Sequence, residues 1–435
     1  MRTTLLRSIV VFAASGLLAC TGTTTTTGGG GGSATGGGSA AGGGTATGGG
    51  VGPGGGSAIG GGGAATGGGS AIGGGTATGG GSATGGGSAT GGGSATGGGG
   101  AAAGGGAATG GGSATGGGTA SGGLFTQPEP WTKDVSQLTP STRSGDIITA
   151  LKNAGGWGNG NKLQIDFSII LLTADSTTPR EQINGPNGAG NNSGYCYNGN
   201  DCESVPYQMP IPTNGNAEGS NSNDYNCDVA NNDCHVLVVE TSQQKLYELY
   251  NATQSGSQIN ALGGFIWDLN KAYPDNERGD QCTSADAAGF PIAGLLVTAD
   301  EVASGTVPHA VRFILPNDHM KADVYVHPAS HAGGPTSSDA NAPPYGVRFR
   351  LKSSFSETNY NAAEKAVLHA MKTYGMLLSD GGNIALTFGD DRLNTAKWSS
   401  LGIDSMSFSG ITPDDFEVVD LGNEITVTNN CVLNP

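Results

Sequence analysis

Short runs in which hydrophobic and polar residues alternate dominate the chain beyond residue 160. Successive side chains of a strand point to opposite faces, so this period of two predicts β-strands. The runs 376–380 and 384–388 flank Gly-Gly-Asn and are expected to form a tight hairpin. Strands are expected at residues 163–172, 235–240, 245–250, 264–269, 291–298, 307–315, 322–327, 344–352, 376–380, 384–388, 417–420 and 425–427.

Helical spacing of apolar residues is found in two segments, 144–154 and 360–374. Many short strands, turn-rich connections and few helices predict a mainly β fold. We expect an antiparallel β-sandwich or jelly-roll-like domain with a few helices. A propeller would show a repeat of roughly 40 residues, which this sequence lacks. Residues 175–234 have little periodicity and are rich in Gly, Asn and Asp, so a long surface loop is expected there.

The first 19 residues have the organisation of a secretory signal peptide. Arg2 and Arg7 give a basic start, and the apolar run that follows ends at Ala19. This run is too short to span a bilayer, which needs roughly 20 residues. Leu17-Leu18-Ala19-Cys20 resembles the lipobox of bacterial lipoproteins, which implies that Cys20 is lipidated and becomes the first mature residue. The alternative is an ordinary signal peptide that happens to be followed by a cysteine.

Residues 20–123 are Cys20 followed almost entirely by Gly, Ser, Thr and Ala, mostly in a six-residue repeat such as Gly-Gly-Gly-Ser-Ala-Thr. The repeat has no hydrophobic face, so we do not expect it to stack as a solenoid. It buries too little to offset the entropy of ordering it. We predict a disordered tether with an end-to-end distance of about 55 Å. One globular domain is then expected over residues 124–435.

The predicted globular domain is strongly acidic. The chain has 19 Lys and Arg against 35 Asp and Glu, and Arg2 and Arg7 belong to the signal peptide. The remaining 17 positive charges against 35 negative ones give a net charge of −18. We therefore expect no binding to nucleic acid or to an anionic membrane surface.

Six cysteines follow Cys20, and four of them crowd into the loop at residues 175–234. An even number in an exported domain predicts disulfides, with the pairing left open. A metal site is the weaker alternative because Cys-x-x-Cys is absent. Dinucleotide and phosphate-loop signatures are also missing, so neither a cofactor nor a metal is expected. The disulfide candidates are Cys196, Cys202, Cys227, Cys234, Cys282 and Cys431.

A row of cations lies on the predicted strand 344–352. Arg348, Arg350 and Lys352 alternate with apolar residues and would share one strand face. In one interpretation they pair with acidic residues of neighbouring strands. In the other, they form with Arg312 a groove for an anionic ligand, because the guanidinium fork matches a carboxylate. Such a groove would suit the uronic acids of an acidic polysaccharide.

Acid–base residues near this row are candidates for carbohydrate cleavage. In a lyase, His309, His331 or Tyr345 would abstract the proton beside a uronic carboxylate. In a hydrolase, two carboxylates would flank one glycosidic bond, and Glu248 and Asp286 are the candidates. The alternative for each residue is structural, as a core histidine, an exposed carboxylate or a turn cap. Further carboxylates on or near predicted strands are Glu240, which is expected to face Glu248 across a hairpin, Asp268 and Glu301.

Residues 235–391 resemble a set of exported bacterial proteins with no established activity. The resemblance rests on motifs that include 235–239, 283–289, 309–313 and 374–376. It implies kinship among exported proteins, and it brings no reaction and no catalytic residue to this chain.

The sequence thus predicts a lipid-anchored cell-surface protein whose β-rich domain binds polysaccharide, acidic polysaccharide in particular. Cleavage as a hydrolase or a lyase is an extension of this hypothesis. The alternative is a non-enzymatic surface module for adhesion or envelope structure. The lipid would be the only membrane contact. Thr21 replaces the aspartate that favours inner-membrane retention, which favours the outer membrane. An enzyme should gather the candidate residues in one cleft, and a structural module should scatter them.

Overall fold

The computed structural model describes residues 123–186, 188, 195–196, 201–220 and 224–435, together with short strands within the Gly-rich segment. The predicted signal peptide, Cys20 and most of the predicted tether lie outside the described residues. Within the described residues, no helix has the length and apolar character needed to cross a membrane.

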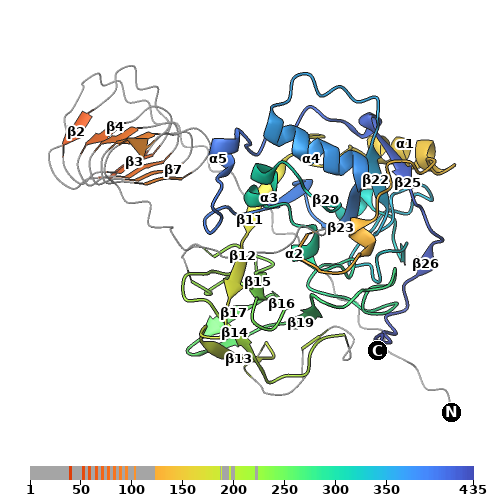
Figure 1. Ribbon diagram of the computed structural model, residues 1–435, viewed down its shortest axis with the longest axis horizontal. Helices are drawn as coiled ribbons and strands as arrows, with labels where there is room; N and C mark the ends of the chain where they lie inside the picture. The colour runs from red at the N-terminus through yellow and green to blue at the C-terminus, as the bar shows by residue number, and fades with distance from the viewer. Residues whose placement is uncertain are drawn as a thin grey trace, which may run out of the picture. The chain divides into compact units, whose positions relative to one another are not determined.

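The Gly-rich segment contains short strands in two sheets (Figure 1). Each strand pairs in parallel with the next strand but one, as β3 does with β5 and β5 with β7. Because the segment is almost entirely Gly, Ser, Thr and Ala, such pairing buries little apolar surface that could stabilise it. The disordered tether therefore stays a prediction. The strands are β1 (Ser39–Ala41), β2 (Val51–Pro53), β3 (Ser57–Ile59), β4 (Ala64–Thr66), β5 (Ser70–Ile72), β6 (Thr76–Thr78), β7 (Ser82–Thr84), β8 (Ser88–Thr90), β9 (Ser94–Thr96) and β10 (Ala102–Ala103).

Beyond this segment lies a β-rich domain whose largest sheet, here called the large sheet, has six strands. Its pairing is mixed: β11 runs parallel to β24 and β20 to β23, whereas β22 is antiparallel to β23 and β25. In spatial order the strands are β11 (Ile165–Ile169), β24 (Leu386–Gly389), β20 (Val311–Leu315), β23 (Met376–Gly381), β22 (Arg348–Leu351) and β25 (Phe416–Val419).

Two four-stranded sheets and a two-stranded one complete the domain. The central sheet has the order β12 (Leu171–Ala174), β15 (Val236–Glu240), β16 (Lys245–Tyr250) and β19 (Gly263–Asp268). The outer sheet has the order β14 (Tyr207–Pro210), β13 (Arg180–Asn184), β18 (Gln258–Asn260) and β17 (Thr253–Ser255). The small ladder pairs β21 (Val324–Tyr325) with β26 (Ile425–Thr426).

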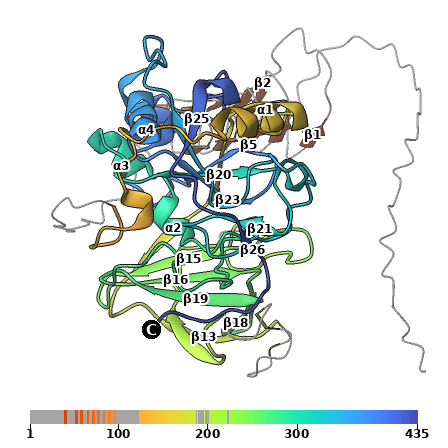
Figure 2. The ribbon, with the colours of Figure 1, turned by 90° about the vertical axis from the view of Figure 1, so that its right-hand side faces the viewer.

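The central sheet is buried on both faces. Along β15, Val236 and Val238 belong to a small core shared with the outer sheet, whereas Leu237 and Val239 belong to the main core. This alternation is the period of two of a strand. Figure 2 shows β15, β16 and β19 between β13 and β18 on one side and β20 and β23 on the other. The central and outer sheets therefore form a sandwich, and the large sheet adds a further layer.

Two longer helices pack against the large sheet (Figure 1). They are α1 (Ser144–Ala154) and α4 (Ala362–Thr373). Helix α4 begins with a capping box, in which Asn361 accepts from the Glu364 amide and Glu364 from the Asn361 amide. The shorter elements are η1 (Pro130–Thr132), α2 (Ile292–Leu295), α3 (Ala299–Ser304), η2 (Asn317–His319), α5 (Trp398–Leu401) and η3 (Pro413–Asp415).

The mainly β prediction is confirmed, with sheets that are mixed rather than purely antiparallel. The strand expected at 291–298 is wrong, because it contains helix α2 and ends at Thr298, which caps α3. The tight hairpin expected between 376–380 and 384–388 is also wrong, because β20 lies between β23 and β24. Strand β20 is buried almost throughout, which suits a central position.

All six predicted cysteines form disulfides. Cys196–Cys202 and Cys227–Cys234 close short loops within residues 175–234, and Cys282–Cys431 joins segments 149 residues apart. Three disulfides are typical of proteins that fold in an oxidising, extracytoplasmic environment.

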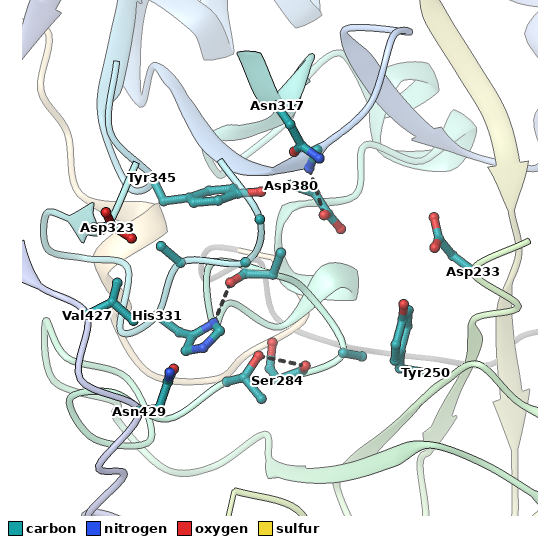
Figure 3. A pocket seen from close by; sticks show the side chains of 17 residues that line it. Asp233, Tyr250, Ser284, Asn317, Asp323, His331, Tyr345, Asp380, Val427 and Asn429 are labelled. Carbon is teal, nitrogen blue, oxygen red and sulfur yellow. Dashed lines mark hydrogen bonds between the residues drawn. The ribbon is translucent and has the colours of Figure 1, made fainter. Parts of the chain in front are cut away.

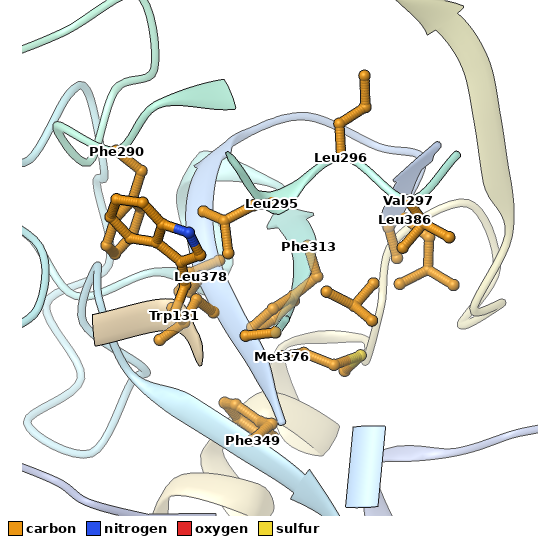
Figure 4. Close-up of a cluster of buried hydrophobic side chains, with 14 of the residues drawn as sticks. Trp131, Phe290, Leu295, Leu296, Val297, Phe313, Phe349, Met376, Leu378 and Leu386 are labelled. Atoms are coloured by element: carbon orange, nitrogen blue, oxygen red, sulfur yellow. The ribbon is translucent and has the colours of Figure 1, made fainter. Parts of the chain in front are cut away.

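Aromatic and aliphatic side chains together fill the core beside the large sheet, as the cluster around Phe313 and Phe349 shows (Figure 4). Trp157 is fully buried and makes edge-to-face contacts with Phe313, Phe349 and Phe416. Its indole N–H donates to the Ile411 carbonyl at 2.9 Å. Buried aromatic rings contribute both area and specific geometry, so Trp157 ties β20, β22 and β25 to the turn that follows α1.

We expect Trp157→Ala to lower the free energy of unfolding by about 3–5 kcal/mol, because a large cavity and an unpaired carbonyl would remain. Urea denaturation followed by circular dichroism measures this change. Leu393→Ala is the control, since Leu393 is 44% exposed and should change stability by less than about 0.5 kcal/mol. Equal losses in both variants would contradict this account of the core.

Candidate functional site

The described part of the domain contains a polar pocket of about 730 Å³ (Figure 3). Its walls come from segments far apart in the sequence, and they include three acids, two amides and two tyrosines. The lining residues are Asp233, Tyr250, Thr283, Ser284, Ala285, Ala287, Asn317, Asp323, His331, Ala332, Gly333, Gly334, Tyr345, Asp380, Gly381, Val427 and Asn429.

Strand topology brings two of these polar residues together. Strands β20 and β23 are parallel, and Ile314 is in register with Asp380. Both strands therefore end at the same edge of the large sheet, where Asn317 follows β20 and Asp380 lies near the end of β23. This edge is where open sheets with parallel strands commonly place binding residues.

A close backbone approach joins two loops of the pocket wall. The Ser330 and His331 amides both donate to the Ala288 carbonyl. Gly289 has φ +93°, and a Cβ there would lie 2.0 Å from Ser330 Oγ. Only glycine fits this conformation and this contact. Gly289 thus holds the 283–288 loop against the 330–334 loop.

Directly beneath the pocket, the buried Arg312 side chain links three strands and a loop. It donates to Asp286 Oδ1 at 2.7 and 3.0 Å, to Asp380 Oδ2 at 2.8 Å and to Thr387 Oγ1 at 2.8 Å. The side chains of Arg312 and Asp286 are 4% and 0% exposed, and that of Asp380 is 23% exposed. Asp380 therefore connects the buried cation to the pocket.

One cation shared by two carboxylates leaves this cluster short of positive charge. Burial raises the pKa of Asp286 to about 8, although Arg312 opposes this rise, and the charge of Asp380 adds to it. Burial also raises the pKa of Asp380. Asp286 Oδ2 is buried without a hydrogen-bond partner among the described residues. A protonated Asp286 would remove one of the two negative charges from a site that cannot solvate both.

A second buried pair, Glu218 and His235, supports the pocket wall from behind. His235 Nδ1 lies 2.5 Å from Glu218 Oε2, and Nε2 lies 3.0 Å from the carbonyl oxygen of Ala285, a lining residue. Both partners are acceptors, so both ring nitrogens must donate. Burial alone would lower the pKa of His235, but the Glu218 charge raises it to about 9. His235 is therefore an imidazolium that holds the 283–288 loop.

The predicted catalytic residues separate into two groups. His331 and Tyr345 line the pocket, and Asp286 lies beneath it with the predicted ligand residue Arg312. His331 Nδ1 is 2.9 Å from the Ala287 carbonyl oxygen, to which it donates.

Glu248 and His309 lie outside the pocket. Glu248 accepts from the Trp267 indole and the Ala293 amide, and burial raises its pKa to about 7. His309 is buried with Nε2 3.3 Å from Glu301. The contacts of Glu248 and of His309 thus hold the core together and do not reach the pocket.

The other strand carboxylates also have structural partners. Glu240 is in register with Lys245 rather than with Glu248, so the expected pair across the hairpin does not form. Glu240 accepts from Arg180 and Tyr247 instead. Asp268 caps a turn through the Asn270 amide, and Glu301 belongs to the capping box of α3.

The cationic row lies on β22, and none of its three residues is among those that line the pocket. Arg348 donates to the Pro130 and Tyr374 carbonyls. Arg350 donates to Glu417, which is directly opposite on β25, and to two backbone carbonyls. Lys352 donates to the Asp414 carbonyl. The ion-pair interpretation therefore describes Arg350, and the three cations take no part in the pocket that the described residues form.

Several lining residues escaped the sequence analysis as site candidates: Asp233, Tyr250, Asn317, Asp323, Asp380 and Asn429. No local motif marks them, because they meet only through the strand order and through the Cys282–Cys431 disulfide. The one group in the described residues with metal-ligand proximity is Asp201, Cys282 and Cys431. Its two cysteines are joined to each other, so they offer no thiolates. His327 and His331 are four residues apart, but they bond to Asp280 and Ala287 separately.

Comparison with known proteins gives no match to any family model, curated protein or solved structure. The resemblances to bacterial lipoproteins and to exported bacterial proteins stay predictions. The geometry of the pocket alone carries the argument for function.

We expect stability to fall as pH rises from about 4 towards 8. Asp286 and Glu248 have raised pKa values of about 8 and 7 in the folded chain. The folded state thus holds protons that the unfolded state has already released, and this stabilising contribution is lost as pH rises through the folded values.

Asp286→Asn should flatten this decline between pH 5 and 8, as measured by the free energy of unfolding in urea at several pH values. Asp318→Asn serves as the control because the Asp318 side chain is 79% exposed. An unchanged slope in Asp286→Asn would show that Asp286 is ionised throughout.

Proposed function

We propose that the β-rich domain is an extracytoplasmic carbohydrate-binding module whose ligand occupies the polar pocket. The observation that carries this proposal is the lining itself, in which two tyrosines accompany acids and amides within one cavity. Sugars present hydroxyl groups that donate to carboxylate and amide oxygens, and apolar ring faces that pack on aromatic rings. Binding sites of this kind place a few polar groups around a concave surface.

The charge of the pocket favours neutral or amino sugars over the acidic polysaccharides expected from the sequence. Asp233, Asp323 and Asp380 line it, and its described lining contains neither Lys nor Arg. The guanidinium of Arg312, which lies beneath the described lining, is already bonded to Asp286, Asp380 and Thr387. A uronic acid would bring a further negative charge into this site without a free cation to pair with it.

Binding without cleavage is the primary form of this proposal. A lyase that uses Tyr345 as base is disfavoured, because burial and the charges of Asp380 and Asp286 raise the pKa of Tyr345. A phenolate would therefore be hard to form. His331 is the other predicted base in the lining, but no Arg accompanies it among the described lining residues.

A hydrolase is the second candidate, and one observation favours it. Asp380 faces the pocket, and burial raises its pKa, with a smaller contribution from the charge of Asp233. A carboxylic acid with a raised pKa suits protonation of a glycosidic oxygen, and a second carboxylate could act as base or nucleophile. In this version Asp380 and Asp233 replace the predicted pair Glu248 and Asp286.

The predicted signal peptide and Cys20 would place this module on a lipid anchor at the cell surface, with the Gly-rich segment as spacer. The three disulfides support an extracytoplasmic location. The competing hypothesis, a surface module for adhesion or envelope structure, predicts that no soluble sugar competes for the pocket.

Isothermal titration with neutral, amino and acidic oligosaccharides tests the proposal on the chain carrying Cys20→Ser, which leaves out the lipid. We expect binding of a neutral or amino sugar and none of oligogalacturonate. Binding of acidic sugars alone, or of no sugar in the panel, would contradict the proposal. Product analysis of the same mixtures by mass spectrometry separates a hydrolase from a binder.

Asp380→Asn and Tyr250→Ala should each weaken binding of the best sugar by about tenfold, because each removes one lining contact. Asp318→Asn, which changes an exposed acid outside the described lining, should leave the affinity unchanged. If the pocket cleaves sugar, Asp380→Asn should also lower the rate by about a hundredfold or more. If both pocket variants keep the affinity of the unmodified chain, the sugar binds outside this pocket.

A further inference from the structure

We propose that the last 15 residues, 421–435, form a strap that is one wall of the pocket and sets which ligands the pocket accepts. In this proposal, which rests on the proposed function, the Cys282–Cys431 disulfide keeps the strap in place. Val427 and Asn429 are the strap residues that line the pocket. In Figure 3 both lie on the side of His331, across the pocket from Tyr250 and Asp233.

Two anchors hold the strap on either side of these lining residues. Before them, Glu424 forms ion pairs with Arg143 at 2.7 Å and Lys321 at 2.7 Å. After them, Cys431 is bonded to Cys282. Residues 425–430 therefore bridge between two fixed points, and the lining residues sit within the bridge.

Strand pairing, partial apolar burial and polar contacts together hold the bridge itself. Ile425 and Thr426 pair with β21, and Ile425 and Val427 are partly buried against the main core. Gln281 Oε1 accepts from the Thr428 and Asn429 amides, and Gln281 Nε2 donates to the Thr426 carbonyl. The amide of Val427 donates to the carbonyl of Asp323, another lining residue. A single hydrogen bond contributes only about 0.5–1.5 kcal/mol net, so the disulfide adds a covalent restraint to these non-covalent contacts.

Further along, the strap has little hydrophobic anchorage. Val432 is 76% exposed and Leu433 is 44% exposed. The backbone instead lies close to Gly279, where a Cβ would be 2.1 Å from the Val432 carbonyl oxygen. The strap therefore follows the 276–283 segment closely, and the disulfide is its only covalent tie to that segment.

The same segment leads directly into the pocket loop. Thr283, Ser284 and Ala285 line the pocket immediately after Cys282. A disulfide at Cys282 thus couples the strap to the loop, and it does so across 149 residues of sequence. Cross-links between distant residues restrict the chain strongly. Reduction of this bond is expected to release the strap and widen the pocket on that side.

Hydrogen–deuterium exchange tests the anchoring without any ligand. In the intact chain with Cys282→Ser and Cys431→Ser, the Thr428 and Asn429 amides should exchange at least tenfold faster than in the unmodified chain. The matched control replaces Cys196 and Cys202 by Ser, which removes a different disulfide and should leave these amides unchanged. Unchanged protection of the strap in the first variant would overturn the proposal.

Two substitutions on the strap itself test its role as a pocket wall and keep every disulfide. Val427→Trp places a bulky ring in the lining, whereas Val432→Trp adds the same ring at an exposed position of the strap. With chitotetraose as the probe, Val427→Trp should weaken binding at least tenfold, and Val432→Trp should change it less than twofold. Equal affinities of the two variants would overturn the proposal.

The two proposals fail separately. If the unmodified chain binds neither chitotetraose nor any other sugar, the proposed function fails, and the exchange experiment still decides whether the disulfide holds the strap. The strap proposal alone fails if sugar binds and two results are negative. These are unchanged exchange of the strap amides without the Cys282–Cys431 disulfide, and unchanged affinity in Val427→Trp.

Discussion

The buried guanidinium of Arg312 is the constraint on which the architecture around the pocket depends. It bonds to side chains from β23, β24 and the 283–288 loop, and it projects from β20 between those strands. Removing it would leave the buried carboxylate of Asp286 and the partly buried carboxylate of Asp380 without a counter-ion, which is strongly destabilising. The same interaction orders the strand ends and orients Asp380 at the pocket.

A deficit of positive charge follows from this arrangement. In the network beneath and behind the pocket, Arg312 and His235 face the carboxylates of Asp286, Asp380 and Glu218. Burial raises the pKa values of Asp286 and Glu248, and the nearby charges of Asp380 and Glu248 add to the rise for Asp286. A pocket above such a network favours ligands that donate hydrogen bonds or carry a positive charge, and it disfavours anions. This physical argument separates neutral and amino sugars from uronic acids.

Much of the fold could be predicted from local patterns, because strands and capped helices depend on near neighbours. The helix expected at 144–154 is α1, and the one expected at 360–374 contains α4. The insertion of β20 between β23 and β24 could not be predicted. A hydrophobic run predicts that a segment is a strand, but it does not determine which strands lie next to it. The disulfides formed from the expected cysteines, whereas their pairing required the fold.

The site was harder to predict, for the same reason. The cations of β22 were candidates because the sequence is acidic and has few Lys and Arg. In the structure, however, Arg350 forms an ion pair with Glu417 on the neighbouring strand β25. The pocket is instead lined by single residues from loop ends and from the strap. None of them belongs to a local sequence motif that would mark it as a site residue. Arg312 and Asp286 were among the candidates, but their pairing with Asp380 required two parallel strands to end together.

The central claim is that this pocket binds sugar, and a crystal structure of the chain with the best-binding oligosaccharide tests it most directly. The account predicts a sugar ring between Tyr250 and Tyr345, with its hydroxyl groups bonded to Asp380 and Asn429. A sugar bound at another surface, with this pocket left to water, would contradict the account.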